Sequence, residues 1–216
     1  MRRTATAAVI LALLALPAMG SAAPSLTGPT GLILIPTAGT LGMTQWNVGA
    51  TGVWADGSGS SVLYANVGLL AGLEAGFARE EMEDAEAETL LNAKLHLLSP
   101  PVGKLKLAAG MIDITDQIDR TPYIVLSHTL GAGVLTRVGP VALPQVHVGV
   151  GGGRLDGLFA GVSTTVNRRW NLMAEYDGEN INVGVRTPVA TNLEATVAIL
   201  DGLDDVAAGL SFSSPW

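Results

Sequence analysis

Three histidines and one serine have the residue types that nucleophilic catalysis requires. Ser127 and His128 are neighbours, while His96 and His147 stand elsewhere in the chain. A serine activated by a histidine could transfer or hydrolyse an acyl group, and a lipid-modifying enzyme that uses His128 or His147 is one hypothesis. Neighbours on a strand point to opposite faces, however, and nothing in the sequence supplies the third group of a triad. We therefore predict no catalytic residue, a position at an interface for His128, and structural roles for His96 and His147.

Carboxylates could bind divalent cations near the C-terminus. Asp201, Asp204 and Asp205 form the best candidate, because hard cations prefer clustered carboxylate oxygens. The segment lacks the ligand spacing of a calcium loop, and solvated acidic loops that repel one another are the more common alternative. The glycine run 149–153 precedes no helical pattern, so it does not predict a phosphate site. We expect no cofactor and no nucleic-acid partner, the latter because the formal net charge is −7.

Polar and charged residues also recur at every second position within apolar segments. Asn92, Lys94 and His96 alternate with leucines, so the polar residues share one face of a predicted strand. An unpaired charge is unfavourable both in a dry core and in lipid, where a Lys near the midplane costs about 2–4 kcal/mol. A polar lumen tolerates such residues. The residues predicted to line a lumen are Glu74, Asn92, Lys94, His96, Lys104, Lys106, Glu175, Asn182, Arg186 and Glu194.

The elements that position these residues are clearest between residues 169 and 216, where the pattern predicts two consecutive β-hairpins. Folding the chain at the turn 177–180 places Tyr176 opposite Ile181 and Leu172 opposite Val185 on one apolar face. The second hairpin, over 193–213, repeats this pattern. A sheet with one apolar face belongs either to a soluble barrel with that face inward or to an outer-membrane barrel with that face toward lipid.

Segments with strand patterns continue along the chain from residue 45, separated by turn signals. The count of about twelve is even, as single-chain bacterial barrels require, and no helical period appears after the first residues. The segment 131–144 is treated as a long loop, although it contains an apolar run. The predicted fold is all-β, an antiparallel up-and-down transmembrane β-barrel of about 12 strands, at 45–54, 61–69, 73–79, 89–98, 104–112, 122–130, 145–151, 157–166, 170–176, 181–186, 193–200 and 206–213.

The acidic residues are distributed unequally between the connections. We number the connections between predicted strands in chain order, starting with the one between the strands at 45–54 and 61–69. The odd-numbered connections contain 16 of the 19 acidic residues and the even-numbered ones contain none. The other three, Glu74, Glu175 and Glu194, lie within strands. Odd connections of an up-and-down barrel all lie at one end. One rim is therefore predicted to be acidic, and it faces the cell exterior if both termini face the periplasm.

The N-terminus has the pattern of an export signal. Arg2 and Arg3 precede an uncharged apolar run and then small residues, which predicts a signal peptide over 1–23. A Gly- and Pro-rich segment follows over 24–44, and its apolar run 32–35 is expected to be buried against or inside the barrel at 45–216. The chain has no Cys, so disulfides and thiolate sites are excluded.

Two stretches resemble a known family. The opening 28–32 with 36–38, and the stretch 172–178 followed by 182–184, are similar to YjbH-like outer-membrane proteins. The resemblance covers about a third of the chain. It implies an outer-membrane β-barrel connected with exopolysaccharide production, and it brings no catalytic residues.

These patterns together predict a bacterial outer-membrane barrel, not an enzyme, with a role in passive transport, secretion support or structure at the cell surface. The expected partners are outer-membrane lipid, polysaccharide, and the barrel-insertion machinery, which would recognise the C-terminal Phe212 and Trp216. Two alternatives stay open: an adhesin or ligand-binding barrel that acts through its acidic loops, and a soluble periplasmic barrel.

Overall fold

The computed structural model describes residues 22–55, 58–83, 85–98, 105–131, 134–136 and 139–214. Most of the predicted signal peptide, and also Lys104 and Trp216, lie outside these residues. Within the described residues, strands make up nearly all the regular structure, with two single-turn 3-10 helices, η1 (Gly153–Leu155) and η2 (Asp201–Leu203). No helix in the described part of the chain is both long and apolar enough to cross a membrane.

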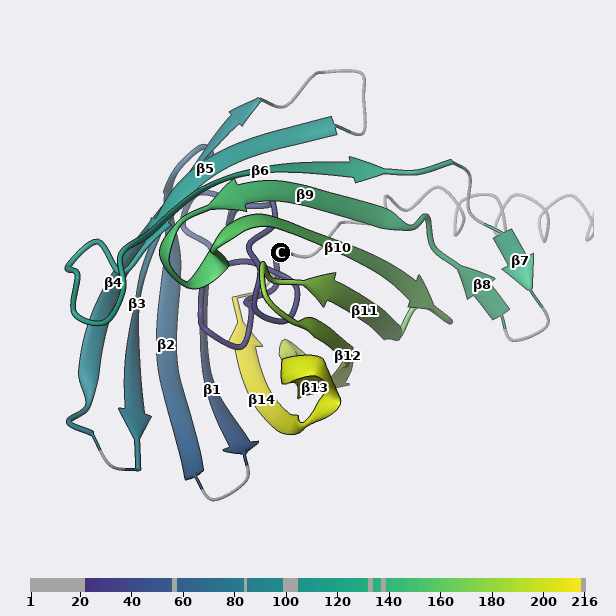
Figure 1. Cartoon of the computed structure of the whole chain (residues 1–216). Coiled ribbons are helices and arrows are strands. Elements are labelled where there is room, and N and C mark those ends of the chain that lie inside the picture. The colour runs from purple at the N-terminus through teal and green to yellow at the C-terminus, as the bar shows by residue number, and fades with distance from the viewer. Residues whose placement is uncertain are drawn as a thin grey trace, which may run out of the picture.

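Twelve antiparallel strands form a closed barrel (Figure 1). Each strand pairs with the next along the chain, β6 pairs with β9, and β1 closes the ring by pairing with β14. The barrel strands are β1 (Trp46–Ala55), β2 (Ser58–Leu70), β3 (Leu73–Met82), β4 (Glu88–Leu98), β5 (Leu105–Ile112), β6 (Thr121–Thr129), β9 (Gln145–Gly151), β10 (Gly157–Val166), β11 (Trp170–Tyr176), β12 (Ile181–Ala190), β13 (Leu193–Leu200) and β14 (Asp205–Ser213). The predicted fold class is confirmed.

The registers of the two C-terminal hairpins match the sequence prediction. Tyr176 lies opposite Ile181 and Leu172 opposite Val185 in the first hairpin, and Leu193 lies opposite Phe212 in the second. Several strands are longer than predicted, and β12 continues to Ala190 rather than ending at Arg186. The turn between β12 and β13 is therefore shorter than the predicted connection 187–192.

The prediction of a loop over 131–144 is wrong in part. This segment contains β7 (Val134–Thr136) and β8 (Gly139–Val141), which pair with each other as a short antiparallel hairpin. Val141 of β8 also pairs with Val166 of β10, so β8 prolongs the line of β9 along that edge. The apolar run in the segment has a strand pattern, and a hairpin adds two strands without changing the direction of β9. The alternation of the two barrel ends is therefore preserved.

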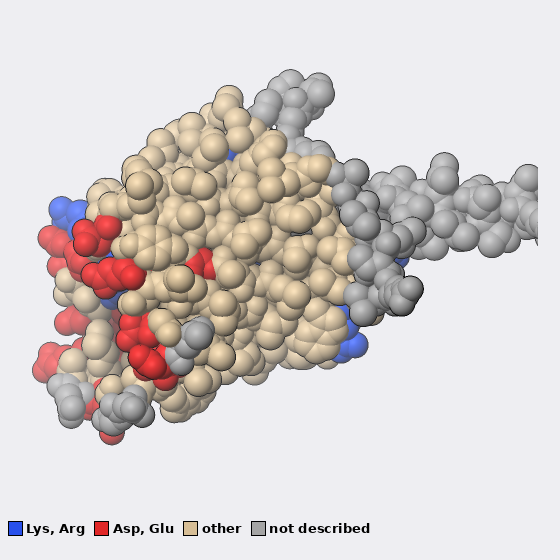
Figure 2. All heavy atoms as spheres, turned by 45° about the vertical axis from the view of Figure 1, so that its right-hand side comes forward, with Lys and Arg blue, Asp and Glu red and all other residues tan. Residues whose placement is uncertain are grey.

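The apolar face of the sheet points outward. Alternate residues of the strands leave large apolar side chains exposed, among them Leu63 (53%), Leu158 (65%) and Leu210 (52%). The acidic residues gather at one end of the molecule, Lys and Arg are visible at both ends, and the side of the barrel in view carries almost no charge (Figure 2). A soluble barrel with the apolar face inward is therefore not what this chain forms.

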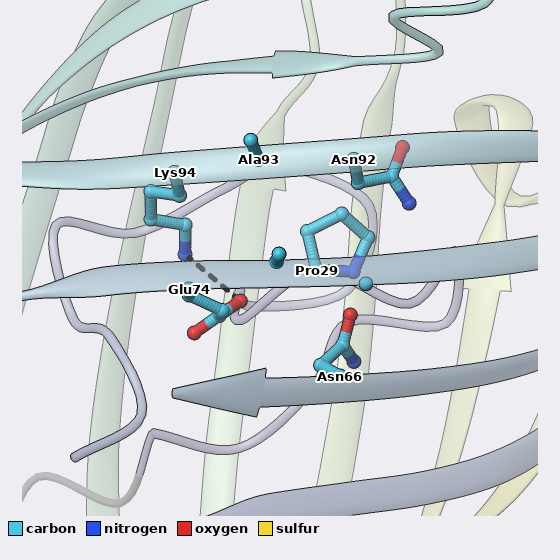
Figure 3. A pocket seen from close by; sticks show the side chains of 8 residues that line it. Pro29, Asn66, Glu74, Asn92, Ala93 and Lys94 are labelled. Carbon is cyan, nitrogen blue, oxygen red and sulfur yellow. Dashed lines mark ion pairs between the residues drawn. The ribbon is translucent and has the colours of Figure 1, made fainter. Parts of the chain in front are cut away.

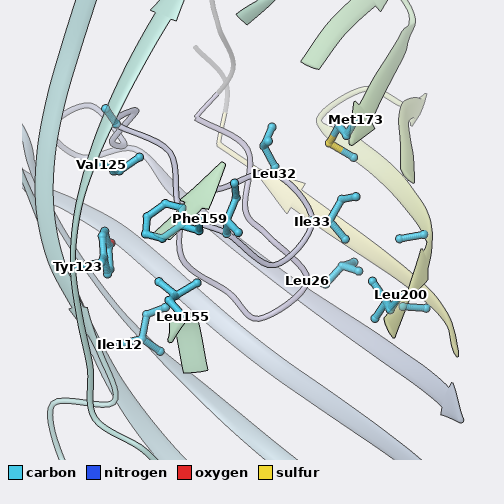
Figure 4. Packing of buried hydrophobic residues seen from close by; sticks show 14 of the residues in the cluster. Leu26, Leu32, Ile33, Ile112, Tyr123, Val125, Leu155, Phe159, Met173 and Leu200 are labelled. Carbon is cyan, nitrogen blue, oxygen red and sulfur yellow. The ribbon is translucent and has the colours of Figure 1, made fainter. Parts of the chain in front are cut away.

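The N-terminal segment fills the lumen. Residues 22–41, which we call the plug, form the purple trace inside the ring of strands (Figure 1), and most of them are buried. The apolar side chains of the plug pack against inward-facing residues of the wall (Figure 4). This core comprises Leu26, Leu32, Ile33, Ile35 and Ala38 of the plug with Ala108, Ile112, Tyr123, Val125, Leu155, Phe159, Met173, Ala198, Leu200 and Ala207.

Replacing Ile33 by Ala tests the contribution of the plug to this core. Ile33 is fully buried, so its truncation should lower the free energy of unfolding by about 2–4 kcal/mol. Urea unfolding of the detergent-solubilised barrel measures the change. The outward-facing Leu158→Ala is the control and should change stability by less than about 1 kcal/mol. Equal effects of the two substitutions would mean that the plug contributes little to stability.

Candidate functional site

The contact between the plug and the lumen wall is the candidate functional site. Gly and Pro residues prevent the plug from forming a helix or a long strand, so many of its N–H and C=O groups have no partner in regular structure. Buried backbone groups need hydrogen bonds. A few internal bonds, such as Leu26 N–H to the carbonyl of Ile33 (2.8 Å), supply part of them. Charged and polar side chains of the wall supply others.

Glu74 on β3 and Lys94 on β4 hold the middle of the plug. The carboxylate of Glu74 accepts hydrogen bonds from the N–H groups of Thr30 (3.0 Å) and Leu41 (2.9 Å) and from the Thr30 hydroxyl. The ammonium of Lys94 donates to the carbonyls of Thr30 and Gly39 (3.0 Å for the latter). The two side chains face each other at 3.9 Å and are almost completely buried (Figure 3). Opposite charges thus bind complementary groups of the same loop.

Glu175 on β11 holds the apolar part of the plug. Its carboxylate accepts hydrogen bonds from three successive backbone N–H groups, those of Ile33 (2.9 Å), Leu34 (2.7 Å) and Ile35 (3.3 Å). Asn182 on β12 donates to Glu175 (3.4 Å) and also to Asp177 (2.8 Å). One buried carboxylate therefore fixes a run of backbone whose side chains lie in the core.

Arg186 on β12 and Asn66 on β2 bind plug carbonyls. The guanidinium of Arg186 donates to the carbonyls of Pro24 and Leu32, each at 2.7 Å. The side-chain amide of Asn66 donates to the carbonyl of Gly28 at 2.7 Å. These contacts involve backbone atoms of the plug, so the wall recognises the path of the chain more than its side chains.

A serine and a histidine are brought together across β6 and β9. The hydroxyl of Ser127 lies 2.7 Å from Nδ1 of His147 and accepts a hydrogen bond from the Ala38 N–H (2.9 Å). His96 on β4 donates from Nδ1 to the carbonyl of Ala38 at 2.9 Å. His128, half-buried, is not part of this cluster. No carboxylate in the described residues orients His147, since its Nε2 has no hydrogen-bond partner there. The geometry suits holding the plug rather than activating a nucleophile.

Asn92, Lys106 and Glu194 lie on the inner face, and none of the hydrogen bonds described for this structure joins them to the plug. Asn92 is buried, and its side-chain oxygen accepts the Asp113 N–H at 3.0 Å. Lys106 lies opposite the buried Ser127 and is exposed, and Glu194 lies opposite the buried Ser211 and is partly buried. Lys104 lies outside the described residues.

An ion pair spans the acidic end of the barrel. Arg154, in η1 between β9 and β10, makes two hydrogen bonds of 2.8 Å to the carboxylate of Glu80 near the end of β3. Burial alone lowers the pKa of Arg154, but the hydrogen bond and the charge of Glu80 outweigh burial and raise it. The neighbouring Leu155 packs into the lumen core beside Phe159. The loop with η1 therefore folds inward over the plug.

The connection from β5 to β6 is organised by Asp113. Its buried carboxylate accepts hydrogen bonds from the Thr115 hydroxyl and from the N–H groups of Gln117, Ile118 and Asp119, at 2.8–3.1 Å. Burial raises the pKa of Asp113, but these hydrogen bonds together lower it below its usual range. This acid shapes its own loop.

The candidate cation site is not assembled in this structure. Among the described residues, no three His, Asp or Glu side chains are grouped so that they could hold a metal ion. Asp201 and Asp204 are exposed, and Asp205 is partly buried.

Sequence reasoning did not assign a place on the lumen wall to Asn47, Asn66, Ser127, Glu80 or Arg154, although it considered Ser127 as a nucleophile. The period-2 pattern could have placed Asn47 and Asn66 on the inner face, because apolar residues flank them on their strands. The Ser127–His147 and Glu80–Arg154 pairs depend on which distant segments meet, and nothing in a single sequence indicates that.

Comparisons with known proteins identify the fold. No protein-family model matches the chain, and no curated protein matches it. Solved structures do match. A KdgM porin is 9% identical with a TM-score of 0.55, and a KdgM porin in complex with disordered oligogalacturonate is 9% identical with a TM-score of 0.52. Each match covers 79% of this chain and 99% of the other. The chain thus has the fold of a twelve-stranded porin.

Replacing Glu175 by Gln tests the hydrogen bonds between its carboxylate and the backbone of the plug. Gln offers one acceptor oxygen and brings an amino group toward N–H donors, so the unfolding free energy should fall by about 2 kcal/mol. Urea unfolding measures it. Glu194→Gln is the matched control, because Glu194 faces the same lumen but makes no hydrogen bond to the plug among those described. A change in the control as large as that in Glu175→Gln would point to lost charge rather than lost hydrogen bonds.

A double-mutant cycle tests the Glu80–Arg154 ion pair at the acidic end of the barrel, which we call the mouth. Glu80→Gln, Arg154→Gln and the double variant should give a coupling energy of about 1–2 kcal/mol, because the pair is bidentate and largely shielded from water. The exposed pair Arg120–Asp116, at 3.5 Å, is the reference and should couple by less than about 0.5 kcal/mol. Coupling near zero at Glu80–Arg154 would show that this pair does not stabilise the closed mouth.

Proposed function

We propose that this chain is a bacterial outer-membrane barrel for passive transport of hydrophilic solutes, and that the plug closes it at rest. The observation that carries the membrane location is the outward-facing apolar surface of the twelve strands. Exposing so large an apolar surface to water is unfavourable for a monomer, whereas contact of this surface with lipid is favourable. The partner of this face is then outer-membrane lipid.

Aromatic residues near the two ends of the barrel support this placement. Trp46 and Phe212 lie side by side with ring centroids 5.8 Å apart, and Trp170 lies next to the guanidinium of Arg169 at one end. Trp54 is exposed toward the acidic end. Such girdles are typical of barrels at the two membrane interfaces. We place the acidic end outside the cell, with the tight turns toward the periplasm.

The polar surface of the lumen wall that the plug covers supports the transport role. Amides, hydroxyls and opposite charges lie on the inner face of β1 to β4, and such a surface suits hydrophilic solutes. The fold is shared with porins, one of which was solved in complex with disordered oligogalacturonate. We propose a saccharide-class solute, and the resemblance to YjbH-like proteins makes exopolysaccharide a candidate source. We also propose that the barrel-insertion machinery recognises the C-terminal strand through Phe212 and Trp216.

A closed structural or adhesive barrel is the second candidate. The apolar core shared by plug and wall favours it, because withdrawal of the plug would expose that core. The Arg154–Glu80 ion pair also favours a barrel that stays closed, because it holds η1 over the mouth. In that case the acidic loops would bind a partner while the lumen stays shut.

Conductance in planar bilayers distinguishes the two candidates. The natural chain should show little or no steady current, because the plug occupies the lumen. The variant Ile33→Ser with Ile35→Ser places hydroxyls in the core and should loosen the plug, giving discrete channels with at least about tenfold higher mean current. A mobility shift on heating in detergent gels verifies that each variant is a folded barrel. Leu158→Ser, on the outer face, is the control and should remain closed.

A folded Ile33→Ser, Ile35→Ser barrel that stays closed would contradict passive transport and leave the structural role. Recovery of the natural chain in the soluble periplasm, without a mobility shift, would contradict the membrane location.

A further inference from the structure

A row of side-chain amides crosses the lumen wall from β1 to β4. Asn47 lies opposite Asn66, Asn66 opposite Gly76, and Gly76 opposite Asn92, so the four residues occupy one line across adjacent strands. Asn47 is the second residue of β1, at the end away from the acidic rim, whereas Asn92 bonds to Asp113 in an outer loop. The row therefore runs obliquely along the wall, from near the periplasmic end toward the mouth.

These amides are buried and incompletely paired. Asn47, Asn66 and Asn92 are each at most 5% exposed. Asn66 donates to Gly28 of the plug and to the Asn47 side-chain oxygen, which is 2.7 Å away. The Nδ2 atoms of Asn47 and Asn92 have no hydrogen-bond partner in the described part of the chain. A buried amide donor without a partner is unfavourable, so each such group needs an explanation.

The surroundings of the row fit a ligand contact. Gly76 has no side chain, and a Cβ there would lie 2.0 Å from the Asn66 side-chain oxygen, so glycine lets Asn66 extend across β3. Asn66 and Asn92 point toward Pro29 of the plug, with the Glu74–Lys94 pair beside them (Figure 3). The crevice among these residues is too narrow for a water molecule while Pro29 is in place. The plug thus covers a surface with spare donors.

We infer that this row, Asn47, Asn66 and Asn92 with the Glu74–Lys94 pair, binds an uncharged, polyhydroxylated solute when the plug moves away. The inference rests on the proposed transport function and names its solute class. An amide offers one acceptor and two donors, which match the hydroxyl groups of a sugar. Glu74 and Lys94 neutralise each other, so the row offers no net charge to an anion. The acidic rim at the mouth further disfavours a polyanion.

The test measures solute block of the current in the loosened-plug background, Ile33→Ser with Ile35→Ser. Maltotriose is the neutral probe, and trigalacturonate is the anionic probe of the same length. Maltotriose should block the channel more tightly than trigalacturonate. Asn47→Leu and Asn92→Leu should each weaken the maltotriose block by about fivefold, because each removes hydrogen bonds to the solute.

Asn171→Leu is the matched control, since Asn171 lies on β11, outside the row. It should leave the block within about twofold. Preferential block by trigalacturonate, or equal effects of Asn92→Leu and Asn171→Leu, would overturn the assignment of the row while leaving passive transport intact. A background channel that folds, shown by the heat-dependent gel shift, but conducts nothing would overturn the proposed function and this inference together.

Discussion

The structure depends on satisfying backbone polar groups inside an enclosed lumen. The plug is too rich in Gly and Pro to form regular structure, so it brings unpaired N–H and C=O groups into a space shielded from water. Glu74, Lys94, Glu175 and Arg186 supply partners for these groups from four different strands. The plug in turn makes the burial of these four charges tolerable, because hydrogen bonds replace their lost hydration. The plug and the charged wall therefore stabilise each other in the closed barrel.

The strands have apolar residues on both sides of the sheet, for two different reasons. The outer face is apolar around the barrel and suits lipid, while the inner face is apolar only where the plug packs against it. Met173 and Phe159 show the second case, since both point inward and are buried by contact with the plug region. A barrel with this interior has a true core, unlike a water-filled pore. Opening therefore requires that hydrophobic and polar contacts of the plug be broken together.

The two ends of the barrel differ in construction. One end has tight turns such as the one between β10 and β11, in which Asn167 and Arg168 both have positive φ, as the central residues of a type I′ turn do. The acidic end has connections that carry structure of their own, including the Asp113 loop and η1, while the β7–β8 hairpin lies at the opposite end. Arg154 joins η1 to the opposite side of the mouth through Glu80. Closure at this end thus adds to closure by the plug.

The sequence alone determined the fold class, the approximate strand positions and the registers of the last two hairpins. These features follow from the local period-2 pattern and from turn signals, which need no knowledge of distant partners. The same pattern placed Glu74, Lys94, Glu175 and Arg186 on one face. Only the tertiary structure decided what that face meets, because the contacts of Glu175 with Ile33 or of Ser127 with His147 join residues that are far apart in sequence. It also decided that the segment 131–144 forms a hairpin, since the pairing of Val141 in β8 with Val166 in β10 joins residues that are far apart in sequence.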